Sequence, residues 1–263
     1  CISAALDHAR ERRAGLLSTF PRQITGSLAE KLVVPLIHFI LLSYLPFARM
    51  RNGRDPSASA ACGQFILIER SAYAAIGGHS SIRNSMHDGV KLPRILRRAG
   101  YHTDLFDGTD LCSCRMYRGL RQTWSGFTKN AYEGLGSPVL LLLITALHLL
   151  GHIAPFIALA VMAATNHWPL PESALTLGAI AGMYAHRLIL ARRFRQSLLG
   201  VALHPIGILF LAAVQWWSFG LSLTGARSWK GRTLRLAEGG GRGKGSLAYE
   251  TSGDSATIPA PSH

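Results

Sequence analysis

The side chains best suited to chemistry gather around Asp88, which is the only acidic residue between Glu69 and Asp104. Asp88 stands where a helical pattern begins. An aspartate there can act as a helix N-cap, which stabilises a helix by about 1 kcal/mol, or as a general base at the mouth of a cleft. Two histidines, His79 and His87, lie near it in the sequence and could orient it or remain on a surface loop.

The residues around Asp88 belong to a series of short motifs. In chain order they are Gly63-Gln64, Gly77-Gly78-His79, His87-Asp88, Met116-Tyr117, Trp124-Ser125-Gly126-Phe127-Thr128-Lys129-Asn130 and Trp229-Lys230-Gly231-Arg232. This order resembles the membrane-bound branch of the family-2 glycosyltransferases, which have a GT-A fold and act on lipid acceptors. Hopanoid-associated, carotenoid and, more distantly, ceramide glycosyltransferases belong to that branch. The resemblance covers about residues 1–236.

The resemblance implies that Asp88 is the general base, which removes a proton from the acceptor hydroxyl as that oxygen attacks the anomeric carbon with inversion. Substrate contacts are expected at Gly63, Gln64, His87, Arg118, Arg121, Gln122 and Trp124. The chain departs from the family's motifs at two positions. Thr123 stands where the family has an arginine directly before the tryptophan, and His87 stands where it has a glutamate before the aspartate. Trp124 is open to two interpretations, a cover for the substrate or an anchor at the membrane interface.

The family's divalent metal ion, Mg²⁺ or Mn²⁺, is bound at an Asp-x-Asp motif, and no Asp-x-Asp occurs in this chain. The chain also begins at Cys1, inside a helical pattern. We therefore expect the metal ligands and the nucleotide-binding strands in an upstream part of the protein, and we expect residues 1–263 alone to be inactive.

Composition indicates a membrane protein. The chain is 48% hydrophobic and yet carries a formal net charge of +14. Its apolar residues form long uncharged runs flanked by basic residues, which is typical of a basic cytoplasmic face beside anionic lipids. The same runs argue against a nucleic-acid partner. The resemblance implies a uridine-diphosphate sugar donor and a lipid acceptor, and together with the basic flanks it implies an inner-membrane location with the catalytic part in the cytoplasm.

The expected fold class is α/β, a partial GT-A catalytic domain followed by transmembrane helices. Residues 1–137 form the first part, with strands near 14–20, 64–69 and 101–106 and helices near 70–76, 88–99 and 120–135. The uncharged run 32–48 is at the short limit for crossing a bilayer, which needs about 20 residues. Because it contains Pro35 and Pro46, an interfacial helix is favoured, with a buried core helix as the alternative.

The second part, residues 138–226, contains three apolar runs at 138–165, 173–186 and 196–226. The second of them requires Arg187 to extend its charge to the membrane surface. The basic loop 192–195 is expected in the cytoplasm. A third crossing would put the basic segment 227–235 outside, so we expect an even number of crossings or a re-entrant hairpin at Pro205. Residues 227–263 are expected to be a basic segment and a disordered tail.

Two further sets of residues, a pair of histidines and the four cysteines, could have a functional or a purely structural role. His148 and His152 lie four residues apart on one helical face, where they could bind a metal or haem, or pack inside a bundle. The four cysteines are too few and too scattered for a disulfide framework, and we expect buried thiols in a reducing compartment.

The sequence therefore predicts a membrane glycosyltransferase that acts on a hopanoid, a carotenoid or a similar lipid. Two alternatives stay open, a processive polysaccharide synthase and a non-catalytic membrane subunit or remnant. The absence of an arginine directly before Trp124 weighs against the synthase.

Overall fold

The structure is a computed structural model. It describes residues 1–53, 55–83, 85 and 87–224, and beyond these the backbone of residues 227–229, 232–236 and 247–251; at Asn130 only the backbone is described. The elements in chain order are α1 (Ile2–Arg12), β1 (Leu16–Gln23), α2 (Leu28–Val33), α3 (Leu36–Tyr44), α4 (Phe47–Asn52), β2 (Ile66–Ile68), α5 (Arg70–Ala75), the 3-10 helix η1 (Gly78–Ile82), α6 (Asp88–Arg98), β3 (Thr103–Cys114), α7 (Gly119–Leu135), α8 (Pro138–His152), α9 (Ala154–Thr165), α10 (Leu170–Arg193), α11 (Leu198–Ala202), α12 (His204–Leu223), β4 (Arg227–Trp229), β5 (Arg232–Leu236) and β6 (Leu247–Thr251).

The first part of the chain is built on a small mixed sheet with the strand order β2-β1-β3. β1 runs antiparallel to β2 and parallel to β3. The parallel register extends from Leu16 opposite Thr103 to Gln23 opposite Cys114, with a bulge between Pro21 and Arg22. The fold is thus mixed α/β and mostly helical, as the sequence predicted at the level of fold class.

Both faces of β1 are covered, because its side chains alternate between two apolar cores. Leu16 packs with residues of α5 and α6, including Ala72, Leu92 and Leu96. Leu17 packs on the other side with Ala5 of α1. Seven of the eight residues of β1 are buried, which is why this strand forms the centre of the sheet.

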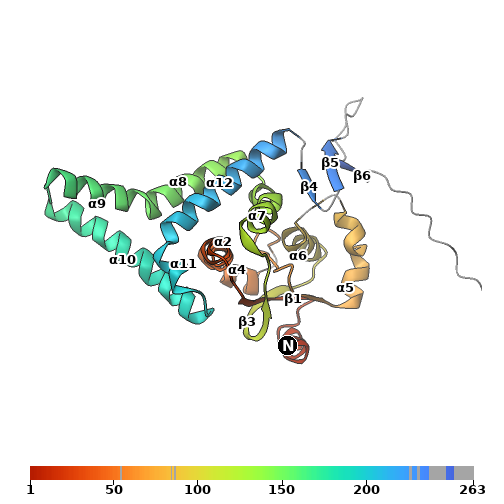
Figure 1. Ribbon diagram of the computed structural model, residues 1–263. Helices are drawn as coiled ribbons and strands as arrows, with labels where there is room; N and C mark the ends of the chain where they lie inside the picture. Colours follow the sequence, from red (N-terminus) through yellow and green to blue (C-terminus); the bar gives the residue numbers. More distant parts are fainter. Residues whose placement is uncertain are drawn as a thin grey trace, which may run out of the picture.

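A third apolar core joins the sheet to the helices of the second part. Phe20 of β1 and Leu105 of β3 share it with Phe39 of α3, Leu190 of α10 and Ile208 of α12. Figure 1 shows α10, α11 and α12 beside α2, close to the sheet, and α9 at the far end of the helical arm. The two parts therefore pack through one continuous core.

A buried arginine fixes the connection between α4 and β2. Arg97 of α6 is 3% exposed, and its guanidinium donates to Thr103 Oγ1 (2.7 Å) and to the carbonyl oxygens of Met50, Gly53, Asp55 and Thr103. These bonds satisfy backbone acceptors of a stretch that has no regular structure of its own.

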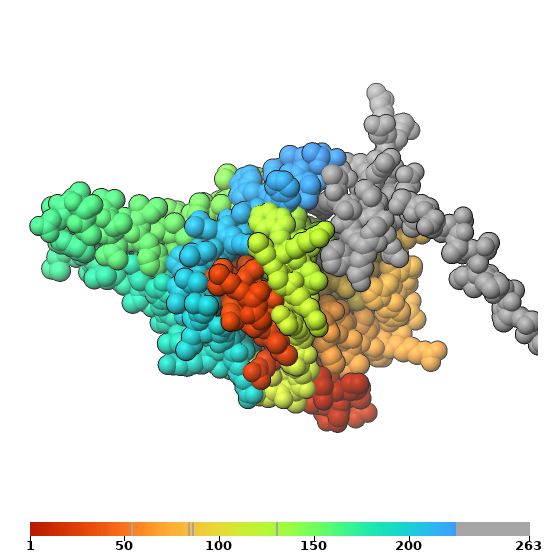
Figure 2. Space-filling model, viewed as in Figure 1, coloured from red at the N-terminus to blue at the C-terminus, as the bar shows by residue number. Residues whose placement is uncertain are grey.

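Among the residues that the structure describes, three helical stretches are long and apolar enough to cross a membrane: Pro138–Thr165, Leu170–Arg193 and His204–Leu223. The first bends at Ile153, where α8 ends and α9 begins, because Pro155 cannot donate to the helical ladder. Large apolar side chains are exposed along these helices, for example Leu170, Leu175 and Leu150 at 81%, 76% and 69%. They form the arm that projects from the sheet-containing part in Figure 2.

The structure differs from expectation at several places. Arg187 does not reach the surface of the bundle, because it is fully buried. The run 32–48 is divided among α2, α3 and α4, with breaks at Pro35 and Pro46, and Leu36 and Phe39 are buried. Part of the tail expected to be disordered forms β6, which pairs with β5. In the motif 229–232, residues 230 and 231 and the side chain of Trp229 lie outside the described residues.

Candidate functional site

Asp88 is the first residue of α6, and the N-cap position belongs to His87. The Asp88 carboxylate therefore does not cap the helix as an N-cap would; its Oδ1 accepts from the next backbone amide, that of Gly89, at 2.7 Å. The carboxylate lies against the backbone of Gly63, since a Cβ added there would be 3.2 Å from Oδ1 and 3.5 Å from Oδ2. Gly63 is exposed and Asp88 is half-buried, so the carboxylate borders an open surface.

The loop that carries Gly63 is held rigidly to β1 and α6. Ala61 donates its amide to the Gly89 carbonyl at 2.7 Å. Ser18 accepts from the Cys62 amide at 2.8 Å and donates to the Phe65 carbonyl at 2.7 Å. Gly89 has no room for a side chain, because a Cβ there would meet the Ala61 carbonyl oxygen at 2.4 Å. The position of the Asp88 carboxylate relative to the loop is therefore fixed by the backbone.

Gln64 points from this loop to the carboxyl end of β1. Its Oε1 accepts from Gln23 Nε2 at 2.7 Å, and its Nε2 donates to Gln23 Oε1 at 3.3 Å. Ligands of open α/β sheets bind outside the carboxyl ends of parallel strands. Gln64 and Gly63 therefore lie where such a site is expected. Gln23, which orients Gln64, was not identified from the sequence.

The two histidines near Asp88 in the sequence have different surroundings. His79 Nδ1 lies 2.7 Å from the Tyr73 hydroxyl, so it pairs with that side chain. His87 lies beside the C-terminal end of α7, because a Cβ on Gly134 would be 3.5 Å from its Nε2. Burial lowers the pKa of His87, against the opposing charges of Glu133 and Asp88, so the ring next to Asp88 is neutral at pH 7.

A buried carboxylate that the sequence analysis did not single out fixes the other end of α7. Glu30 of α2 is 0% exposed, and it accepts from the amide of Gly119, the first residue of α7, at 2.7 Å. It also accepts from the Gly26 amide (2.7 Å), from Ser27 Oγ (2.7 Å) and from Arg115 Nε (3.2 Å). Burial raises the pKa of Glu30, but these hydrogen bonds outweigh burial and hold it well below its usual range.

The sequence signal for Glu30 was partly visible. Ser27 and Glu30 form a capping box at the start of α2, and the Ser-x-x-Glu pattern predicts that local pair. The pattern does not show that the same carboxylate binds Gly119, 89 residues later in the chain.

The remaining predicted substrate-contact residues lie at the N-terminal end of α7. Arg118, Arg121 and Gln122 are exposed, and the Arg118 amide donates to Gln122 Oε1 at 2.8 Å. Trp124 packs on α12, with its ring 5.3 Å from that of Phe210. This contact favours the anchor interpretation of Trp124. His87 and these side chains lie at opposite ends of α7, a helix of 17 residues, so the structure does not gather all predicted contacts into one place.

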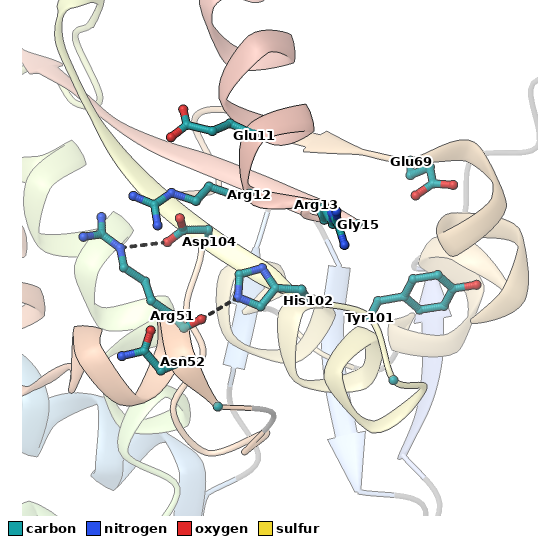
Figure 3. A pocket seen from close by; sticks show the side chains of 12 residues that line it. Glu11, Arg12, Arg13, Gly15, Arg51, Asn52, Glu69, Tyr101, His102 and Asp104 are labelled. Carbon is teal, nitrogen blue, oxygen red and sulfur yellow. Dashed lines mark hydrogen bonds and ion pairs between the residues drawn. The ribbon is translucent and has the colours of Figure 1, made fainter.

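A pocket of about 590 Å³ lies elsewhere, at the amino ends of the parallel strands. Figure 3 shows Arg12 and Arg51 on one side of it, and Tyr101 and Glu69 on the other. Its buried acid, Asp104, is paired with Arg51 at 3.2 Å. None of the residues predicted to be functional lines this pocket.

The described residues do not form a binding site for the expected divalent ion. Among the described residues, no three or more His, Cys, Asp or Glu side chains are grouped so that they could hold a metal ion. Asp88, with one neutral histidine beside it, does not fit a site for Mg²⁺ or Mn²⁺, which prefer several oxygen ligands.

Comparison of the chain with protein-family models, with curated proteins and with solved structures gave no match. The arrangement of Asp88, Gly63 and Gln64 is therefore interpreted through its own chemistry. A half-buried carboxylate that is fixed by backbone contacts and borders open surface is suited to accept a proton from a bound hydroxyl group.

Proposed function

We propose that the chain is the acceptor-side part of a membrane glycosyltransferase of the GT-A type, in which Asp88 is the general base. The sugar would pass from a nucleotide-sugar donor to the hydroxyl group of a lipid. The observation that carries this proposal is the contact between the Asp88 carboxylate and Gly63, next to Gln64 at the carboxyl end of β1. Motif residues from two separate stretches of the sequence, Gly63-Gln64 and Asp88, meet there.

In the proposed reaction, Asp88 accepts the proton of the acceptor hydroxyl while the oxygen forms a bond to the anomeric carbon. The bond from that carbon to the diphosphate oxygen breaks, the nucleotide diphosphate leaves, and the configuration inverts. The leaving group gains negative charge, which nearby cations stabilise. Arg118 and Arg121 are exposed cations at the start of α7, at the end of that helix opposite to His87, and their assignment to this role follows only from the resemblance. The described residues contain no group of three or more His, Cys, Asp or Glu side chains that could hold a divalent ion, and these steps are assigned only to side chains of this chain.

A lipid acceptor is supported by the packing of α7. This helix carries Trp124 and Tyr132 on the side that faces α12, where Tyr132 also donates its amide to Ser218 Oγ at 3.1 Å. α12 is one of the three candidate membrane spans. An acceptor held in the membrane could therefore reach the polar loops along α7. The acceptor class, a hopanoid, carotenoid or similar lipid, and the inner-membrane location with a cytoplasmic site follow only from the resemblance.

The test is sugar transfer by the full-length protein in membranes, with labelled nucleotide sugars and a lipid extract. Asp88→Asn keeps the size of the side chain and removes its basicity. We expect a fall in transfer of about 10²–10⁴-fold with donor binding intact, the usual range for a general base. Asp7→Asn is the matched control, because Asp7 is exposed on α1.

The outcomes separate the alternatives. A labelled lipid that disappears with Asp88→Asn and persists with Asp7→Asn supports the proposal, and mass spectrometry then identifies the acceptor. Wild-type turnover by Asp88→Asn would remove Asp88 from the mechanism. Label in a polymer would indicate a polysaccharide synthase, and label in no product would indicate a non-catalytic subunit.

A further inference from the structure

Five polar side chains meet inside the membrane-helix region, far from Asp88 in the sequence. This polar cluster consists of His148 and His152 of α8, His186 and Arg187 of α10, and His204 of α12. The ring of Phe39 lies at its centre, with centroids 5.1 to 6.0 Å from those of the four histidines. His204 Nε2 and His152 Nδ1 are 3.2 Å apart. Each of the three candidate membrane spans contributes to the cluster.

The cluster contains buried polar groups that lack a hydrogen-bond partner. Arg187 and His148 are 0% exposed, and His204 is 1% exposed. Within the described part of the chain, the three guanidinium nitrogens of Arg187, both ring nitrogens of His148 and Nδ1 of His204 have no hydrogen-bond partner. A buried polar group without a partner is strongly unfavourable, and a buried charge more so. Such a concentration of unpaired donors indicates a place where a ligand supplies the partners.

Another buried arginine shows what a structural arginine looks like in this protein. Arg97 is covered almost as completely as Arg187, and yet it donates five hydrogen bonds to protein oxygens. Arg187 donates none within the described residues. The protein therefore satisfies a buried guanidinium where the role is structural, and it leaves Arg187 with unused donors.

The surrounding helices cannot supply the missing negative charge. Glu172 is the only acidic residue between Glu133 and Glu238. It lies in the first turn of α10, 15 residues before Arg187, which corresponds to about 22 Å along a helix. Asp107, on β3, is already paired with Arg193 at 2.6 Å. The anion that Arg187 needs must therefore come from outside the bundle.

We propose that the polar cluster binds the phosphate group of a membrane lipid. A phosphate oxygen pair matches the fork of the guanidinium, and imidazole N–H groups add further donors. Basic pockets between transmembrane helices are known to take lipid phosphates. The acyl chains would lie on the apolar surface that α8, α10 and α12 expose, for example at Leu150 and Leu177. This site is independent of the transfer reaction proposed for Asp88.

The test compares a phospholipid with the same lipid without its phosphate and with the phosphate alone. The purified full-length protein in detergent is titrated with short-chain phosphatidic acid, with the diacylglycerol of the same chain length, and with inorganic phosphate, and binding is followed by calorimetry. We expect phosphatidic acid to bind at least about ten-fold more tightly than the diacylglycerol, a difference that one charge-assisted hydrogen bond provides. We expect it also to bind at least about ten-fold more tightly than inorganic phosphate, because only the lipid has acyl chains to bury on the apolar surface. Equal binding of the diacylglycerol would overturn the proposal. Equal binding of inorganic phosphate would show an anion site without lipid specificity and would also overturn it.

Variants locate the site. Arg187→Met should lower the affinity for phosphatidic acid at least about ten-fold, whereas Arg192→Met, at an exposed position on the same helix, should leave it unchanged. Without lipid, Arg187→Met should melt at the same temperature as the wild type or higher, because an unpaired buried charge is removed. If Arg187→Met fails to fold, the affinity for phosphatidic acid is measured on His148→Phe instead, which preserves an aromatic ring next to Phe39 and Tyr44. Wild-type affinity in the folded variants would refute the site.

Discussion

Replacing Glu30 by glutamine tests how firmly the start of α7 is held. The two carboxylate oxygens share six incoming hydrogen bonds. Oε1 accepts from Ser27 Oγ, from Arg115 Nη2 and from the amides of Ser27 and Gly119, and Oε2 accepts from the Gly26 amide and from Arg115 Nε. An amide can keep only one of these oxygens. Its NH₂ group would then face the donors of the other oxygen, and the amide of Gly26 or of Gly119 would lose its partner.

The expected loss follows from that geometry. A hydrogen bond to a charged group contributes about 1.5–3 kcal/mol, and a buried donor left without a partner costs about 1–3 kcal/mol. The Arg115 side chain is 38% exposed, so its share is small, about 0–1 kcal/mol. We expect Glu30→Gln to lower the free energy of unfolding by about 3 kcal/mol. Arg115→Met should lower it by about 1 kcal/mol or less.

The pH dependence gives an independent check. Because the hydrogen bonds hold the pKa of Glu30 below its ordinary value of 4.5, its stabilisation is complete above pH 4.5 and is lost as the pH falls towards the folded value. Between pH 7 and pH 3.5 the wild type should therefore lose about 1 kcal/mol more than Glu30→Gln.

The assay is urea unfolding in detergent, followed by tryptophan fluorescence, with Glu172→Gln as a control at an exposed position. The reasoning is refuted if the free energy of unfolding of Glu30→Gln at pH 7 lies within about 1 kcal/mol of the wild-type value, since such a loss is below the smallest sum of the contributions above. It is equally refuted if the difference in free energy of unfolding between the wild type and Glu30→Gln increases on acidification.

Two further substitutions probe contacts described above. Gly63→Ala would put a Cβ 3.2 Å from Asp88 Oδ1, so sugar transfer should fall about ten-fold through displacement of the base, while thermal stability changes little. The control is Gly182→Ala, because nothing lies within 4 Å of a Cβ at that position. Equal transfer by both variants would contradict the expectation. Arg97→Met removes five hydrogen bonds and should destabilise the protein by about 3–5 kcal/mol. This is the opposite of the effect expected for Arg187→Met. A melting temperature of Arg97→Met equal to that of the wild type would contradict the expectation.

The sequence was most informative where a pattern is local and long. The apolar runs of the second part correspond to the three stretches that can cross a membrane. The helices predicted at 88–99 and 120–135 are α6 and α7 to within a residue at each end. For the membrane stretches the information lies in the length of apolar runs without charged side chains, and for α6 and α7 it lies in the helical pattern of the residues, with Gly100 ending the first of them.

The sequence was least informative where a distant partner decides the structure. A short strand was predicted at 101–106, and the residues that follow, Asp107-Gly108-Thr109-Asp110, have the composition of a turn. In the structure the strand continues to Cys114, since its neighbour β1 pairs with it as far as Gln23. The buried state of Arg187 was missed for the same reason, because one helix does not reveal what its neighbours cover.

The position of α7 unites these features. Its first residue, Gly119, is held by Glu30, and its last turns lie beside His87. Its apolar side lies on α12 through Trp124 and Tyr132. A shift of α12 would therefore move both the exposed arginines at one end of α7 and the surroundings of His87 at the other. If Asp88 is the base, this helix is the element through which the packing of the membrane helices sets the geometry of the site. Substitutions on α12 that face α7 should then lower transfer without touching any group that takes part in the chemistry.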